Sequence, residues 1–294
     1  MRVVALTIIT FLCSCNASAT FGAAEDWNHP PKTLPDGVEH KTFHSKSMNT
    51  EVGYNIYLPP NYAGNDKRYP VIYFLHGRGG NESSSVFLFE MFDKAIKAGE
   101  IPPMIYVTAN GEKNSGYVDS PDGTIMSDTA IIKELIPHID ATYRTIADRS
   151  DRAIEGFSMG GQGALLFAFK YPDMFCAVCG YGAGLARGAE LQKELPVVFK
   201  KMHNDNIEQF DHSSAWFYAK ENADRIREKV AIKLGLGDKD THLDRNRRMH
   251  ALLNELKIPH EYQELPDVKH DTKKVYQMIG VDGWKFEAAH MGQH

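Results

Sequence analysis

The stretch IEGFSMGGQGALLF, residues 154–167, decides how this chain folds. A hydrophobic run leads into it and a run of good helix formers follows, so a strand is expected to pass directly into a helix. The turn between them, Gly156-Phe157-Ser158-Met159-Gly160, matches G-x-S-x-G, in which a serine is held in a strained backbone conformation with its hydroxyl exposed. The pattern predicts that Ser158 is a nucleophile. The alternative is a glycine-rich packing turn without chemistry.

Strand and helix patterns alternate along the rest of the chain. Strands are expected at residues 51–59, 69–77, 103–109, 151–158, 174–182, 230–237 and 259–265. Helical patterns fall between them, for example at residues 128–143 and 243–257. This order predicts an α/β fold whose central sheet is mostly parallel and flanked by helices on both faces, with an antiparallel pair at its N-terminal edge.

A serine hydroxyl is a weak nucleophile unless a base takes its proton and an acid orients that base. In sheets of this kind the partners follow the serine in the order acid, histidine, each on a loop after a later strand. The loop after residues 230–237 offers Asp238, Asp240 and Asp244. We favour Asp240 as the acid, because Asp238 lies at the strand end and Asp244 suits the start of the next helix.

The base is expected on the loop after the last predicted strand. His270 lies there, in the segment PDVKHD. His242 is too close to the acid in sequence, and His290 lies in a segment that we expect to be a frayed tail. Because His270 must be neutral to accept the serine proton, activity is expected to rise with pH through about 6 to 7.

The oxyanion that forms when the serine attacks a carbonyl needs backbone N–H donors. Met159 supplies one, because it directly follows the nucleophile. The second is expected from the glycine-rich loop HGRGGN, residues 76–81, at Arg78 or Gly79. We favour the Arg78 amide. The Arg78 side chain is expected either to face solvent or to reach an acidic part of a substrate.

Five segments, in this order, resemble the "putative-esterase" family of α/β-hydrolases. They are VGYNIYLPPNY (52–62), RYPVIYFLHGRGG (68–80), KELIPHIDATYRT (133–145), DRAIEGFSMGGQGAL (151–165) and YPDMF (171–175). The similarity spans residues 38–275. The family includes feruloyl and acetyl xylan esterases, enterochelin esterases, S-formylglutathione hydrolases and mycolyltransferases, so the resemblance implies an α/β-hydrolase fold and an esterase activity.

The resemblance also bears on the site residues. In the family the acid follows a G-x-x-D turn and an asparagine stands six positions later, and Gly237, Asp240 and Asn246 fit this pattern. The family's histidine matches at His270-Asp271. The sequence departs from the family at GYGAG, residues 180–184, where many relatives have a Ser-Gly pair. Since that loop lies near the substrate in the family, the departure weakens any transfer of substrate identity.

Among the family's members, secreted carbohydrate esterases of feruloyl or acetyl type are the most similar in character. The long segment between the strands at 174–182 and 230–237 is rich in helix formers and in the aromatic residues Phe210, Trp216, Phe217 and Tyr218. It is expected to form a partial lid whose rings stack on a sugar or an aromatic acyl group, or else anchor the segment to the core. Substrate contacts are expected at Gly79, Tyr117 and Trp216.

The N-terminal residues predict export. Residues 1–19 combine Arg2, an apolar run and a final Ala17-Ser18-Ala19, which is the layout of a secretory signal peptide. The segment LCSC resembles an imperfect lipoprotein cleavage box, so a lipid on Cys15 is the alternative to cleavage near Ala19. Residues 20–37 are expected to be an irregular leader and residues 38–294 the esterase domain. A secreted or periplasmic location follows, with a membrane anchor only if Cys15 is lipidated.

Composition limits the classes of function. The net charge of -5 arises from scattered charges without a basic stripe, which argues against nucleic-acid binding. The segment DKDTHLD, residues 238–244, lacks the glycine and the terminal glutamate of a calcium loop, so neither a metal nor a cofactor is expected. Cys176 and Cys179 lie in a strand-like run and are therefore too far apart for a disulfide, so we expect buried free thiols.

The sequence thus predicts a serine carboxylic-ester hydrolase that acts through an acyl-enzyme on a small-molecule or polysaccharide ester. Three alternatives stay open. An acyltransferase shares the same residues and prefers an alcohol to water. A serine peptidase of the prolyl-oligopeptidase type has the same residue order but usually carries a large extra domain. A non-catalytic carbohydrate-binding protein would use the same scaffold without turnover. The sequence does not fix the oligomeric state.

Overall fold

The structure is a computed structural model that describes residues 27–292. The predicted signal peptide, Cys15 and the first residues of the predicted leader lie outside the described residues. The described strands form one sheet in the order β1-β2-β4-β3-β5-β6-β7-β8. Their bounds are β1 (Val38–Ser45), β2 (Thr50–Tyr57), β3 (Val71–Leu75), β4 (Ile105–Ala109), β5 (Arg152–Phe157), β6 (Ala177–Tyr181), β7 (Ala231–Gly237) and β8 (Glu261–Leu265).

The sheet is mostly parallel, as predicted. Strands β3 to β8 all run in one direction, while β2 pairs antiparallel with both β1 and β4. Strand β1 is not predicted from the sequence, because VEHKTFHS alternates only weakly and is largely polar. Strand β1 lies at the edge of the sheet. Its pairing with β2 along its whole length stabilises it, and at an edge one face can stay polar.

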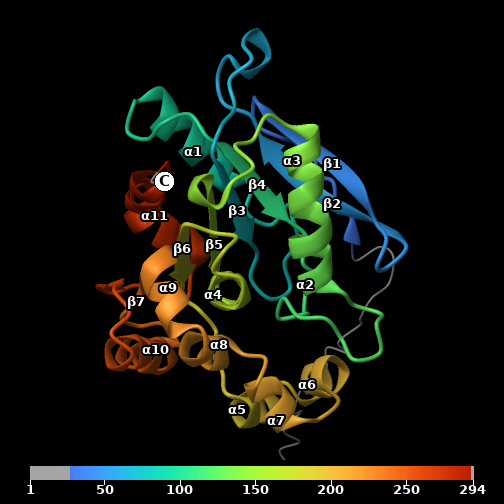
Figure 1. The fold of residues 1–294 in the computed structure, drawn as a ribbon, viewed down its shortest axis with the longest axis vertical. Coiled ribbons are helices and arrows are strands. Elements are labelled where there is room, and N and C mark those ends of the chain that lie inside the picture. The colour runs from blue at the N-terminus through green and yellow to red at the C-terminus, as the bar shows by residue number, and fades with distance from the viewer. Residues whose placement is uncertain (1–26, 293–294) are drawn as a thin grey trace, which may run out of the picture.

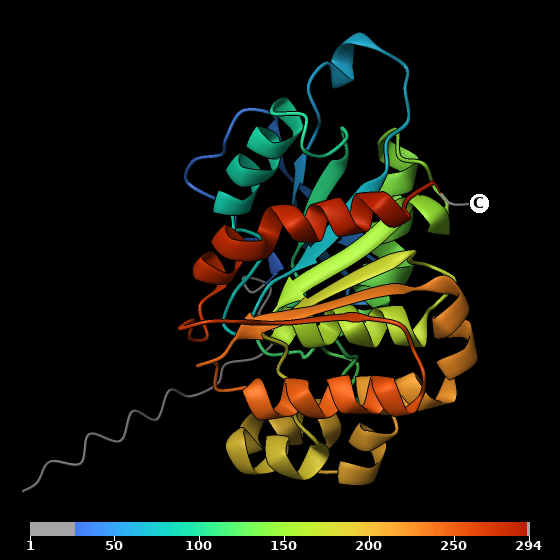
Figure 2. The ribbon, with the colours of Figure 1, turned by 90° about the vertical axis from the view of Figure 1, so that its left-hand side faces the viewer.

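Helices cover both faces of the sheet (Figure 1). The α-helices are α1 (Phe87–Lys97), α2 (Ser127–Thr129), α3 (Ile136–Thr142), α4 (Met159–Lys170), α5 (Gly188–Glu194), α6 (Pro196–His203), α7 (Ile207–Asp211), α8 (Ala215–Glu221), α9 (Ala223–Lys229), α10 (Leu243–Glu255) and α11 (Thr272–His290). Helices α1 and α11 pack on one face, and Figure 2 shows α11, in red, across the near side of the strands. Helices α3, α4, α8, α9 and α10 contribute to the core on the other face.

The helix expected at residues 128–143 is present but irregular. Helices α2 and α3 are joined by a π-helical stretch, Ala130–Leu135. Pro137 lies at the start of α3 and has no N–H to donate, and its ring excludes a carbonyl four residues earlier. We attribute the wider π-helical turns before it to this exclusion, because they relieve the clash without ending the helix.

The C-terminal segment is ordered helix and not the frayed tail that was expected around His290. Helix α11 buries Val275, Tyr276, Ile279 and Trp284 against the sheet, and His290 is its last residue. No helix within residues 27–292 combines the length and the apolar character needed to cross a membrane. Cys176 and Cys179 are free and buried, as predicted.

Candidate active site

Ser158 lies in the turn between β5 and α4, and its backbone has the positive φ that the G-x-S-x-G pattern implies. Its φ is 60° and its ψ is -116°, a conformation that costs energy for any residue with a side chain. The turn is tight because α4 approaches the end of β3: a Cβ on Gly160 would lie 2.5 Å from the carbonyl carbon of Leu75. Glycine at position 160 therefore permits the approach, and the serine hydroxyl is held at the carboxyl edge of the sheet.

The structure brings Ser158, His270 and Asp240 into one hydrogen-bonded chain. Ser158 Oγ lies 2.8 Å from His270 Nε2, and His270 Nδ1 lies 2.8 Å from Asp240 Oδ2. Since an ionised carboxylate only accepts, Nδ1 donates its proton to Asp240 and leaves Nε2 free to accept from the serine hydroxyl. The Asp240 side chain has 0% exposure, and its other oxygen accepts the backbone N–H of His242 at 2.7 Å.

Parallel strands place these residues together, because β5, β7 and β8 end at the same edge of the sheet. The other two acidic candidates have different partners. Asp238 Oδ1 accepts the backbone N–H of Asp267 at 2.8 Å, which ties the acid loop to the histidine loop. Asp244 lies in the first turn of α10, where it pairs with Arg248 at 3.2 Å. Asp240 is the aspartate of this loop that contacts the histidine.

Two backbone amides are available beside Ser158. Met159 is the first residue of α4, so its N–H has no acceptor inside the helix. Gly77 and Ser158 are adjacent, since a Cβ on Gly77 would lie 3.4 Å from that of Ser158. In the described part of the chain neither the Arg78 nor the Met159 amide has a hydrogen-bond acceptor, whereas the Gly79 amide donates to Lys113 O at 2.7 Å. The geometry favours Arg78 over Gly79 as the second donor.

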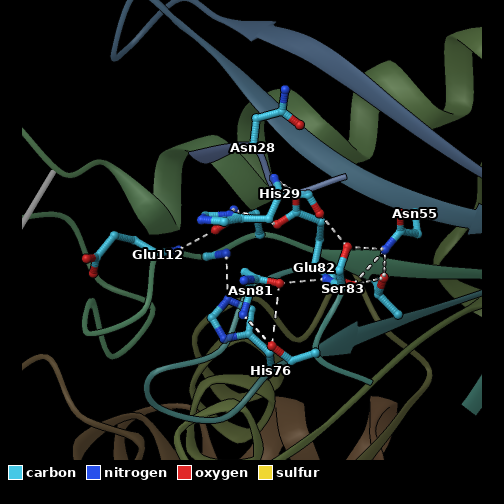
Figure 3. Close-up of polar contacts among 12 residues, drawn as sticks. Asn28, His29, Asn55, His76, Asn81, Glu82, Ser83 and Glu112 are labelled. Atoms are coloured by element: carbon cyan, nitrogen blue, oxygen red, sulfur yellow. Dashed lines mark hydrogen bonds and ion pairs between the residues drawn. The ribbon is translucent and has the colours of Figure 1, made fainter. Parts of the chain in front are cut away.

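A buried polar network fixes the loop that bears Arg78 (Figure 3). His76 Nδ1 lies 2.9 Å from the carbonyl of Gly77, and its Nε2 accepts the Gly111 N–H at 3.1 Å. Burial lowers the pKa of His76 to about 4, so this histidine stays neutral and retains both contacts. Further along the loop, the carboxylate of Glu82 accepts from Asn110 at 2.7 Å and from the backbone N–H of His29. The leader residue His29 thus helps to anchor the loop.

Two predicted substrate contacts are wrong. Tyr117 has 0% exposure, and its hydroxyl donates to the carbonyl of His76 at 2.9 Å, so the ring is part of the core beneath the site. Trp216 is 3% exposed, its indole N–H donates to the carbonyl of Leu185 at 3.2 Å, and the Arg187 guanidinium covers its ring. The tertiary fold turns both rings inward, which is the anchoring alternative for Trp216. The third predicted contact, Gly79, is exposed on the loop beside the serine.

The expected lid is a set of short helices at one end of the molecule, α5 to α7, seen at the lower end of Figure 1. It has its own small apolar cluster of Ala186, Leu191, Phe199 and Phe210. A narrow crevice runs from Arg78 and Gln162 between this segment and the loop at residues 114–118. Its lining combines serine, asparagine and glutamine side chains with leucine, valine and phenylalanine. The cavity there is only about 20 Å³, enough for about one water molecule, so it is not by itself a substrate pocket.

His242 lies in the site, although its closeness to Asp240 in the sequence argues against it as the base. Its ring lies edge-on to His270, with 4.6 Å between the ring centres. Burial and the neighbouring His270 lower the pKa of His242. Asp240, His242 and His270 each offer a ligand atom for a cation, and these atoms lie within 4.8 Å of one another. Asp240 Oδ2 and His270 Nδ1 already share a hydrogen bond, so a cation bound through these two atoms would have to replace it.

Comparison with known proteins gives three kinds of likeness. Residues 45–289 match the family described as "Putative esterase". A protein named "Endo-1,4-beta-xylanase/feruloyl esterase" from Xylanibacter ruminicola is 36% identical over 171 residues, which cover 54% of this chain and 22% of that protein. "Esterase Rv1288" from Mycobacterium tuberculosis is 34% identical over 139 residues, 46% of this chain and 30% of that protein. The chain thus spans less than a third of the length of these curated relatives.

Solved structures agree with the predicted fold. A ferulic acid esterase superposes with a TM-score of 0.75 at 28% sequence identity, covering 87% of this chain and 98% of that one. An S-formylglutathione hydrolase from Agrobacterium tumefaciens has a TM-score of 0.75 at 17% identity, covering 90% and 100%, which is a likeness of fold. The predicted α/β-hydrolase fold is confirmed. Because the family match covers most of its length, this chain belongs to the "Putative esterase" family.

Proposed function

We propose that the protein is a serine carboxylic-ester hydrolase. The observation that supports this most is the hydrogen-bonded chain from Ser158 through His270 to the buried Asp240. It supplies a nucleophile, a base in the required tautomer and an acid that orients the base. The amides of Arg78 and Met159, which have no acceptor among residues 27–292, would supply the remaining element, which is a pair of donors for a developing negative charge.

In the proposed reaction, Ser158 Oγ attacks the ester carbonyl while His270 Nε2 takes the serine proton. The carbonyl oxygen becomes an oxyanion and accepts from the Arg78 and Met159 amides. His270 then gives its proton to the leaving alcohol as the acyl group stays on Ser158. A water molecule releases the acid by the same two steps, with His270 as base and then as acid. Asp240 keeps the imidazole in its orientation and stabilises its positive charge.

The proposed substrate is a carbohydrate ester of feruloyl or acetyl type. The names of the relative from Xylanibacter ruminicola and of the ferulic acid esterase support this class. We also propose export from the cytoplasm, which rests on the predicted signal at residues 1–19 and suits a polymeric substrate outside the cell.

Hydrolysis by purified protein lacking residues 1–19 tests the proposal, with Ser158→Ala beside it. The first substrates are 4-nitrophenyl acetate and butyrate, and the next are acetylated and feruloylated oligosaccharides. The wild type should turn over the simple esters, and Ser158→Ala should lose several powers of ten in kcat. Equal rates for the two proteins would contradict the proposed role of Ser158. Turnover of simple esters without any preference for the sugar esters would contradict the proposed substrate class.

A further inference from the structure

The loop that follows β6, residues 182–185, lies between the nucleophile and the acid. The Gly184 N–H donates to the Ser158 carbonyl at 3.0 Å, and the residue just before the loop, Tyr181, accepts the Ser158 N–H at 2.9 Å. On its other side the loop faces the acid, since a Cβ on Gly182 would lie 3.2 Å from Asp240 Oδ2. Any movement of this loop would therefore change the position of Ser158 relative to Asp240.

Each of the four carbonyls of the loop accepts a hydrogen bond from a different side chain. His242 Nδ1 lies 3.3 Å from Gly182 O, and Asn246 Nδ2 lies 2.8 Å from Ala183 O. Arg245 Nη1 lies 3.3 Å from Gly184 O, and Trp216 Nε1 lies 3.2 Å from Leu185 O. A carbonyl can only accept, so His242 must hold its proton on Nδ1 for this contact. Ordinary loops leave many of their carbonyls to water, whereas all four carbonyls here have a side-chain donor.

The donors belong to two elements that are already tied to the site. His242, Arg245 and Asn246 belong to the cap and first turns of α10, directly after Asp240, and Trp216 lies in α8. The backbone of His242 also bonds to Asp240 Oδ1, so the acid and the loop share one support. Arg245 also forms an ion pair with Glu194, the last residue of α5, and so links the loop to that helix. Side-chain donors thus hold the carbonyls of the loop, while backbone hydrogen bonds from the Gly182 and Gly184 N–H groups tie it to Gly235 and Ser158.

We propose that Trp216, His242, Arg245 and Asn246 are positioning residues that hold residues 182–185 as a rigid spacer between Ser158 and Asp240. The inference rests on the proposed function, because it assigns these four side chains to the geometry of that reaction. It gives Trp216 a role that its buried ring allows, in place of the substrate contact expected from the sequence. It also gives a reason for the GYGAG segment: two of its small residues, Gly182 and Gly184, lie next to Asp240 and Ser158 respectively.

Two matched pairs of variants separate positioning from general stability. Trp216→Phe keeps a buried ring and removes the indole donor to the loop. Trp284→Phe makes the same change where the indole donates to Glu155 in the core, at 3.0 Å. Asn246→Ala removes the hydrogen bond to Ala183 O, 2.8 Å, together with a second one to His242 O, 3.0 Å. Asn222→Ala removes a hydrogen bond of 2.8 Å to Phe169 O at the end of α4. The loss of thermal stability is measured for both variants of each pair, so that their losses of kcat can be compared with it.

The readouts are kcat and KM for 4-nitrophenyl acetate and the rate at which a fluorophosphonate labels Ser158. Because a displacement of about 1 Å in an active site costs up to about 100-fold in rate, Trp216→Phe and Asn246→Ala should each lower kcat and the labelling rate by about tenfold, with KM within about twofold of the wild type. Trp284→Phe and Asn222→Ala should leave kcat within about twofold, whatever they do to stability.

Equal losses of kcat within either pair would overturn the proposal, because the loop donors would then matter only for folding. Unchanged kcat in both loop variants would overturn it as well. The labelling rate separates this failure from a failure of the proposed function. If wild-type protein is labelled at Ser158 but hydrolyses no ester, the substrate class is wrong and the labelling rates of the variants still test the spacer. If wild-type Ser158 is not labelled, both the proposed triad and the proposed spacer are wrong.

Discussion

Replacing Gly160 with alanine should separate the two N–H donors proposed for the oxyanion. Gly160 follows Met159 in α4, and its α-carbon faces the end of β3, from which the loop with Arg78 continues. An added Cβ would lie 2.5 Å from the carbonyl carbon of Leu75 and 2.7 Å from the carbonyl oxygen of His76. Both neighbours are backbone atoms, so no side chain can rotate away. The helix and the strand themselves must move apart.

The contact distances give the size of this movement. Two carbon atoms pack best at about 3.5 to 4.0 Å, and the carbonyl oxygen of Leu75 would lie nearer to the added Cβ than either atom named above, so α4 and the end of β3 must separate by at least about 1 Å. Overpacking of this kind costs about 1–3 kcal/mol of stability, partly offset by about 1 kcal/mol from the better helix propensity of alanine. Because the Met159 amide moves with α4 and the Arg78 amide with the β3 loop, kcat should fall by about 100-fold.

The assay combines the free energy of unfolding in urea with kcat for 4-nitrophenyl acetate. Gly64→Ala is the control, because a Cβ added to Gly64 would meet no atom within 4 Å. The control should stay within about 0.5 kcal/mol of the wild type with unchanged kcat. A Gly160→Ala protein with wild-type stability and a kcat within about twofold of the wild type would refute the reasoning. The space between α4 and the end of β3 would then be larger than the structure shows.

Three further results are expected. Asp240→Asn should lower kcat by about 10³ to 10⁴-fold while KM changes little, because an amide in place of the carboxylate favours the wrong His270 tautomer; steady-state kinetics that show less than a tenfold loss would argue against Asp240 as the acid. Burial raises the pKa of both Glu155 and Glu287, so the folded protein binds more protons than the unfolded chain and loses stability as these groups ionise. The stability of Glu155→Gln relative to the wild type, measured by urea unfolding, should therefore increase as the pH rises from about 5 to about 8, and a difference that does not change with pH would contradict this. Burial also raises the pKa of the Cys176 thiol to about 12, so a thiol reagent at neutral pH should label neither Cys176 nor Cys179 until the protein is unfolded, and rapid labelling of the native protein would show that the thiols are accessible.

Much of the site was predictable because its members follow from the topology. The G-x-S-x-G turn marks the end of one parallel strand, and the carboxyl ends of parallel strands meet at one edge. Asp240 and His270 were therefore assigned from their order and their loops, and the structure places both within hydrogen-bond distance of the predicted partners. The preference for the Arg78 amide over Gly79 also agrees with the structure, where the Gly79 amide is bonded elsewhere.

The remaining errors concern side chains whose direction depends on distant parts of the chain. Tyr117 turns into the core because its hydroxyl meets the carbonyl of His76, and Trp216 because its indole meets Leu185. Neither partner can be recognised from local pattern. His242 was dismissed by sequence distance, yet the cap of α10 turns its ring back onto His270. Strand β1 was missed because an edge strand with one exposed face needs few apolar residues.

The most direct test of the central claim is mass spectrometry of an acyl-enzyme. Wild-type protein is mixed with excess 4-nitrophenyl butyrate, quenched in acid within milliseconds to seconds, digested and analysed. We predict that a butyryl group replaces the hydroxyl hydrogen of Ser158, with no such adduct in Ser158→Ala. The adduct should persist longer in His270→Ala if that variant is acylated, because the base for its hydrolysis is then missing. Ester turnover with no adduct on Ser158 at any quench time, or an adduct on another residue, would contradict the account.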